Sequence, residues 1–248
     1  MPLEGGEVAS SPGGLPPAVD IRVFSSADEA LRRQDDFLGT APPRGPSLLL
    51  WQSPRALLAG PTDARLPSFD EARKACAEAG WPVAVRRGGG RVCPVSPGTL
   101  QVAISRPVAP GFTIDRGYEE MASLIDRLLA RLGLEGERGP CPDAFCPGRY
   151  DIAVAGSKVA GLAQAWRRRD GAMIAIVGAS IVVDEPASVL AEAVNLFYRR
   201  IPASPHCRAG AVGSLSALAR HPVTVRQVLH TLEETYGQDG WMMAPSAE

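Results

Sequence analysis

The sequence predicts an α+β fold with a mixed, largely antiparallel sheet flanked by helices. Ser47 to Gln52, SLLLWQ, is a short apolar run between proline-rich breakers, which is typical of a buried strand. Tyr118 to Leu132 carries large apolar side chains at helical spacing and is followed by Gly133, which indicates a long amphipathic helix. Strand and helix patterns alternate without a regular β-α-β rhythm, and this favours a mixed or antiparallel sheet.

Local signals predict the other elements. Strands are expected over Ile21 to Ser25, Arg55 to Leu58, Pro82 to Arg86, Leu100 to Ser105 and Ala172 to Val183, and helices over Ala27 to Leu38, Pro186 to Tyr198 and Val223 to Tyr236. Ser68, three residues before Glu71, predicts a capping box for a helix that runs to Glu78 and ends at Gly80. Residues 1–17 are rich in Gly, Pro and Ser and are expected to be disordered, and residues 18–240 are expected to form a single domain.

Composition excludes several classes of protein. The 248 residues carry a net charge of −1 without an acidic or basic block, which argues against nucleic acid as the main partner. The N-terminus lacks the basic-then-apolar pattern of a signal peptide, and no apolar run is long enough to span a membrane. The five cysteines form no CxxC pair and no array with zinc spacing, so a reduced, cytoplasmic protein without a metal is expected.

A hairpin is predicted after the last pair of cysteines. Tyr150 to Ala155 has the pattern of a strand, and Gly156-Ser157 suits a two-residue turn with glycine at the position of positive φ. Lys158 would begin the return strand, which would bring its ammonium near the thiol of Cys146 at one edge of a sheet. That pair suits acyl transfer, because a thiolate can attack a carbonyl while the cation stabilises the developing charge.

Simpler interpretations stay open for each motif. The hairpin could carry a solvated lysine and an inert cysteine, and Cys141, which also precedes a proline, competes as nucleophile. Arg86 to Arg91, RRGGGR, could hold an anion on its backbone amides and arginines, or it could be an ordinary basic turn. Trp166 to Arg169, WRRR, is most simply a solvated turn, with an acidic partner as the alternative.

Two blocks taken together resemble a known family. They are VRRGGGRVCPVSPGTLQVAIS, Val85 to Ser105, and YDIAVAGSKVAGLAQ, Tyr150 to Gln164. In order and strand context they resemble the lipoate–protein ligase and octanoyltransferase superfamily, whose fold is shared with biotin protein ligases. Cys146 to Ile152, CPGRYDI, is similar to the cysteine motif of its cysteine-dependent branch, the octanoyl/lipoyl-protein amidotransferases. Asp63 to Pro67, DARLP, resembles that branch's D-x-x-L-P.

The resemblance implies a biotin/lipoate protein ligase-like catalytic domain and an acyltransferase of lipoate metabolism. Such an enzyme moves an octanoyl or lipoyl group between a carrier protein and a lipoyl-domain lysine through a cysteine thioester. Cys146 would be the nucleophile, and Lys158 would donate to the oxyanion. The substrate-binding residues implied are Arg86, Arg87, Gly88, Gly89, Gly90, Gly161, Ala163 and Gln164. The partners implied are lipoyl domains, the glycine-cleavage H protein or acyl carrier protein, with no nucleic acid, membrane or cofactor.

Two other functions are weighed against this one. An ATP-dependent lipoate–protein ligase would need ATP and magnesium, but Val177-Gly178-Ala179 stands where ligases have a His-Gly-Thr-like stretch. A non-catalytic lipoyl-domain-binding homologue is suggested by Ser96 in place of the family's usual aspartate and Gln101 in place of its asparagine.

Overall fold

The computed structural model describes residues 18–37, 46–169, 171–199, 201 and 206–238. The segment expected to be disordered, 1–17, and the end of the expected domain, 239–240, lie outside the described residues. The strands are β1 (Ala18–Val23), β2 (Ser47–Gln52), β3 (Ala56–Ala59), β4 (Val83–Val85), β5 (Cys93–Val95), β6 (Thr99–Pro107), β7 (Glu137–Arg138), β8 (Ile152–Val154), β9 (Ser157–Arg169) and β10 (Ala172–Val182). The helices are α1 (Ala27–Phe37), α2 (Phe69–Glu78), α3 (Ile114–Arg131), α4 (Ala187–Tyr198), α5 (Leu215–Leu218) and α6 (Val225–Gln238), with 3-10 turns η1 (Asp63–Arg65) and η2 (Ala209–Ala211).

The fold is α+β, as predicted. A seven-stranded sheet has the order β1-β2-β6-β10-β9-β8-β7, and a three-stranded sheet has the order β4-β3-β5. In the large sheet only β1 and β2 pair in parallel, so the sheet is mixed and largely antiparallel. Among the described residues, no helix is long and apolar enough to cross a lipid bilayer.

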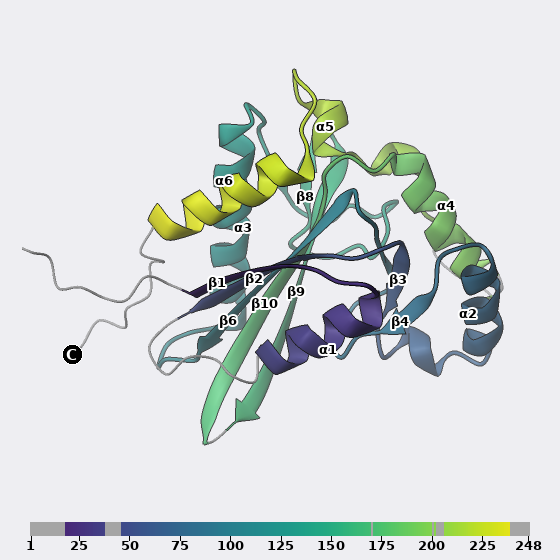
Figure 1. The fold of residues 1–248 in the computed structure, drawn as a ribbon, viewed down its shortest axis with the longest axis horizontal. Coiled ribbons are helices and arrows are strands. Elements are labelled where there is room, and N and C mark those ends of the chain that lie inside the picture. Colours follow the sequence, from purple (N-terminus) through teal and green to yellow (C-terminus); the bar gives the residue numbers. More distant parts are fainter. Residues whose placement is uncertain (1–17, 38–45, 170, 200, 202–205, 239–248) are drawn as a thin grey trace, which may run out of the picture.

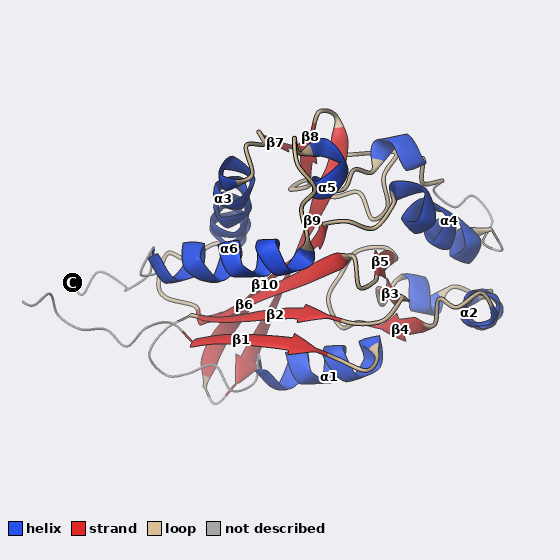
Figure 2. Ribbon diagram, turned by 45° about the horizontal axis from the view of Figure 1, so that its top comes forward, coloured by secondary structure: helices blue, strands red, loops and turns tan. Residues whose placement is uncertain are grey.

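Helices cover both faces of the large sheet, as Figure 2 shows for α3 and α6 on one side and α1 on the other. The alternation along β2 explains this arrangement, because successive strand side chains point to opposite faces. Leu48 and Leu50 belong to the core under α3 and α6. Leu49 and Trp51 belong to a second core shared with α1, the small sheet, α2 and α4. The site described below lies on the α1 face.

Several local expectations were wrong. The turn between β8 and β9 is Ala155-Gly156, one residue earlier than predicted, with φ of 49° and 76°. Ser68 makes no capping hydrogen bond through its side chain at the start of α2. Trp166 to Arg169 is not a turn, because it continues β9 in register with β10 as far as Arg169 opposite Ala172. Backbone pairing with an apolar neighbour strand overrides the polar composition of this segment.

Candidate active site

A pocket lies between α1 and the large sheet. Its floor consists of small residues aligned across neighbouring strands: Ser180 pairs with Gly161, and Gly178 pairs with Ala163. Short side chains at the same level leave space that larger residues would fill. The α1 residues Leu31 and Gln34, with Trp51, Leu58, Phe145 and Val102, complete a mainly apolar lining.

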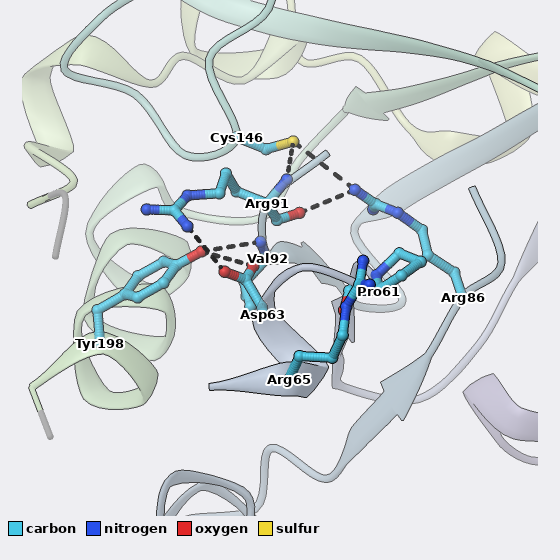
Figure 3. Close-up of polar contacts among 8 residues, drawn as sticks. All are labelled: Pro61, Asp63, Arg65, Arg86, Arg91, Val92, Cys146 and Tyr198. Atoms are coloured by element: carbon cyan, nitrogen blue, oxygen red, sulfur yellow. Dashed lines mark hydrogen bonds and ion pairs between the residues drawn. The ribbon is translucent and has the colours of Figure 1, made fainter. Parts of the chain in front are cut away.

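Cys146 lies at this pocket on the loop between β7 and β8. Its sulfur lies 3.2 Å from the backbone nitrogen of Arg91 and 3.7 Å from Nη2 of Arg86 (Figure 3). Both groups donate toward the sulfur. Cys146 has a φ of 43°, a conformation that non-glycine residues adopt at a cost. The surrounding structure must therefore hold this loop in place.

Lys158 holds the loop that carries Cys146 in place. Its side chain is fully buried, and Nζ lies 2.9 Å from the carbonyl oxygens of Phe145 and Cys146 and 2.9 Å from Oδ1 of Asp151. A lysine ammonium has three N–H donors, and here three acceptors surround it. The Asp151 carboxylate also accepts from the backbone nitrogen of Gly148 at 2.9 Å, which ties down the far side of the same loop. Burial raises the pKa of the Asp151 carboxyl, while the adjacent Lys158 ammonium lowers it.

Two glycines are required for this packing. A Cβ on Gly90, whose φ is +100°, would lie 2.6 Å from Nη2 of Arg86 and 3.0 Å from the Cys146 sulfur. A Cβ on Gly161 would lie 3.0 Å from both Cε and Nζ of Lys158. The absence of a side chain at Gly161 therefore leaves room for Lys158 and also keeps the pocket floor open.

A second hollow adjoins the pocket and shares Leu31, Gln34, Arg86, Ala163 and Gly178 with it. Arg87, Gly88 and Gln164 line this hollow. Asp35 of α1 also lines the hollow, and its carboxylate pairs with Arg87 at 3.1 Å and with Arg167 at 3.3 Å. Opposite charges therefore lie side by side at the edge of the pocket. They come from α1, from β9 and from the segment Arg86 to Arg91, called the glycine turn below.

The structure thus brings most of the predicted site residues together. Cys146, Lys158, Arg86, Gly161 and Ala163 line the pocket, and Arg87, Gly88 and Gln164 line the adjoining hollow. Gly89 supplies a carbonyl that Arg86 binds at 3.0 Å, and Gly90 allows the approach of the Cys146 sulfur.

Cys141 has a different environment from Cys146. It is partly buried and is not among the described residues that line the pocket. Burial raises the pKa of the Cys141 thiol, and the charge of Asp151 raises it further. The geometry therefore favours Cys146 over Cys141 as the nucleophile.

The two residues that depart from the family pattern have local roles here. Oγ of Ser96 accepts from the backbone nitrogen of Gly98 at 3.1 Å, and the Ser96 backbone nitrogen donates to Oγ1 of Thr99 at 2.9 Å. Serine therefore closes the turn into β6, as an aspartate could. Gln101 lines the pocket and donates to Oγ of Ser180 at 3.0 Å.

Sequence reasoning missed several residues of the site. Asp151 was noted only as part of a motif, although the lysine in a buried strand should have suggested a carboxylate partner. The contributions of Leu31 and Gln34 could not be seen, because the sequence does not show which element covers the α1 face. Asp63 and Tyr198, which contact the glycine turn, were likewise not proposed as site residues.

The sequence profile of the lipoyl protein ligase A/B catalytic domain matches residues 26–237. The chain belongs to this family. An octanoyl-[GcvH]:protein N-octanoyltransferase of Exiguobacterium sibiricum is 27% identical over 89% of this chain and 82% of its own. One of Bacillus velezensis is 31% identical over 73% of this chain and 66% of its own. A lipoyl-[GcvH]:protein N-lipoyltransferase of Listeria monocytogenes is 27% identical over 86% of this chain and 77% of its own.

Solved structures share the family fold. Lipoate-protein ligase A bound with ATP superposes with a TM-score of 0.71 over 90% of this chain and 85% of its own, at 16% identity. A lipoate protein ligase from T. acidophilum with bound lipoic acid gives 0.70 over 90% of this chain and 86% of its own, at 16% identity. At such identities the likeness establishes the fold, and the chemistry has to be argued from the site.

Proposed function

We propose that this chain is an octanoyl or lipoyl amidotransferase that carries the acyl group on Cys146. The observation that carries this proposal is the place of the Cys146 sulfur, which lies at a mainly apolar pocket and within reach of two N–H donors. The names of the relatives support acyl transfer from the glycine-cleavage H protein. The acceptor is a lysine of a lipoyl domain.

The reaction proceeds in two halves. The Cys146 thiolate adds to the carbonyl of the donor's octanoyl-lysine amide, the C–N bond breaks, and the donor amine leaves with one proton taken up. A thioester remains on the enzyme. The neutral amine of the acceptor lysine then adds to the thioester carbonyl, the C–S bond breaks, and the proton taken up first is released. An acyl carrier protein thioester could enter the first half in the same way, with a thiolate as leaving group.

Lys158 positions the nucleophile. Because its three N–H donors face Phe145, Cys146 and Asp151, it fixes the backbone from which the sulfur projects. To donate to a developing oxyanion it must release one of these three acceptors. Losing such a donor costs roughly a hundredfold or more in rate.

The pocket suits a medium-length acyl chain. Gly161, Ala163 and Gly178 form its floor, and Leu31 covers it. Burying an aliphatic chain stabilises the complex by roughly 0.8 kcal/mol per CH₂. An octanoyl chain therefore gains several kcal/mol before orientation costs. Chain-length preference is accordingly set by the small residues of β9 and β10.

The proposal needs no nucleotide, metal or other cofactor, and places the enzyme in the cytoplasm, where its five free cysteines stay reduced. The test is transfer from octanoylated H protein to a lipoyl domain, with and without ATP and magnesium. Transfer without ATP, abolished by Cys146→Ser, is the expected result. Lipoylation only from free acid with ATP would make the chain a ligase, and binding of the lipoyl domain without transfer would make it a non-catalytic homologue.

A further inference from the structure

The N–H donor that meets Cys146 belongs to a turn with little intrinsic rigidity. Arg91 follows Gly88, Gly89 and Gly90, and glycine loses more backbone freedom on ordering than any other residue. Gly89 and Gly90 are exposed. The direction of the Arg91 backbone N–H therefore depends on contacts made elsewhere.

Those contacts converge on a buried carboxylate. Oδ1 of Asp63 lies 3.1 Å from Nη1 of Arg91, and Oδ2 accepts from the hydroxyl of Tyr198 at 2.9 Å (Figure 3). The same hydroxyl accepts from the backbone nitrogen of Val92 at 3.0 Å. Asp63 therefore binds the side chain of Arg91, and Tyr198 binds the backbone nitrogen of the next residue, Val92.

Both residues are suited to this role. Asp63 is fully buried on η1, and Tyr198, the last residue of α4, is 2% exposed. Burial raises the pKa of the Tyr198 hydroxyl, so it keeps the proton that it donates to Asp63. The Arg91 guanidinium also lies 5.5 Å from the centre of the Tyr198 ring. A buried carboxylate held by two partners has a single well-defined position.

The segment before Asp63 and the glycine turn before Arg91 also pack closely through their backbones. A Cβ on Gly60 would lie 2.0 Å from the Gly90 carbonyl oxygen, so the segment that leads into η1 packs directly against the glycine turn. Neither Asp63 nor Tyr198 is among the described residues that line the pocket. They act on the sulfur indirectly, through the side chain of Arg91 and the backbone of Val92.

We propose that Asp63 and Tyr198 are positioning residues that set the Arg91 backbone N–H on the Cys146 sulfur and thereby control the reactivity of this thiol. The proposal rests on Cys146 being the nucleophile of the proposed function. Tyr198 is the more informative test residue, because Tyr198→Phe removes a single oxygen while the ring keeps its place in the core.

The experiment compares wild type with Tyr198→Phe and Asp63→Asn. Alkylation of Cys146 by iodoacetamide at pH 7.5, followed by peptide mass spectrometry, reports on the thiol without any acyl donor. Steady-state kinetics with octanoylated H protein separates kcat from KM, and hydrogen exchange reports on the peptide that contains Arg91 and Val92. Tyr236→Phe is the matched control, because Tyr236 is a fully buried tyrosine in the other core.

In Tyr198→Phe we expect alkylation of Cys146 and kcat to fall about tenfold, KM to change less than twofold, and the Arg91–Val92 peptide to exchange faster. Asp63→Asn should act in the same direction. Tyr236→Phe should leave alkylation and kcat within twofold even where it lowers the melting temperature. The proposal is overturned if Tyr198→Phe folds and keeps wild-type alkylation, or if the losses in all three variants follow their melting temperatures. Failure of acyl transfer by wild type would instead refute the proposed function.

Discussion

Lys158 and Asp151 form a buried ion pair, with Nζ 2.9 Å from Oδ1 and each side chain 1% exposed. The pair joins β9 to the loop that carries Cys146, since Lys158 also binds the carbonyls of Phe145 and Cys146. A buried pair of this kind is costly to form and still more costly to break. Its place beside Cys146, the proposed nucleophile, links the stability of the loop to the proposed chemistry.

Lys158→Met should destabilise the fold by about 3–5 kcal/mol, because it leaves the Asp151 charge buried and unpaired. Urea denaturation at pH 7 measures the free energy of unfolding. The double variant Lys158→Met with Asp151→Asn should regain part of the loss, since it removes the orphaned charge. A single variant as stable as wild type would show that the pair does not hold the loop.

The same variant should show a distinct pH dependence. Burial raises the pKa of Asp151, and Lys158→Met removes the charge that opposes this effect most strongly. A carboxyl whose folded pKa is raised contributes stability below its unfolded pKa and loses it as pH rises through the folded pKa. The destabilisation by Lys158→Met should therefore be small in acid and grow toward neutral pH. A pH-independent loss would contradict this reasoning.

Gly90→Ala should impair thioester formation, while Gly88→Ala should not. A methyl group on Gly90 meets Arg86 Nη2 and the Cys146 sulfur, and the φ of +100° is unfavourable for alanine. Gly88 has open space around its Cβ position. Rates of acyl-enzyme formation should fall at least tenfold in Gly90→Ala, whereas equal rates in the two variants would remove the turn from the mechanism.

Gly178→Val should shift the acyl preference toward shorter chains. Gly178 lies in the pocket floor, and the added side chain occupies part of the space. Donors with four, six and eight carbons, compared by kcat/KM, give the preference. Ala172→Val on the exposed end of the same strand is the control. An unchanged profile in Gly178→Val would place the acyl chain elsewhere.

Native protein should be alkylated first at Cys146. Burial raises the pKa of Cys141, and raises the pKa of Cys76 and of Cys207 to about 11, so the thiolate fraction of these thiols at pH 7.5 is small. Labelling of Cys141 should rise as pH increases, and urea should expose Cys76 and Cys207. Faster labelling of Cys141 than of Cys146 at pH 7.5 would reverse the assignment of the nucleophile.

Much of the fold could be predicted from the sequence where a single pattern dominated. The strand at Ser47–Gln52 has the predicted bounds, because a short apolar run between prolines leaves little choice. α3 begins four residues before the predicted Tyr118, at Ile114, because its start is fixed by the Thr113 cap rather than by the apolar repeat. Periodicity shows the buried face of a helix and not its ends.

The site could be predicted only in part. Cys146 and Lys158 share one hairpin region, so sequence proximity and a known motif brought them together. Asp63 and Tyr198 are 135 residues apart, and only the packing of η1 against the end of α4 makes them neighbours. Contacts of this kind depend on tertiary structure, which no local pattern contains.

The most direct test of the thioester mechanism is the intact mass of the protein after incubation with octanoylated H protein in the absence of ATP. Wild type and Cys141→Ser should gain one octanoyl group, which hydroxylamine removes, and Cys146→Ser should gain none. An adduct that persists in Cys146→Ser, or the absence of an adduct in a wild-type protein that transfers the acyl group, would contradict a thioester on Cys146.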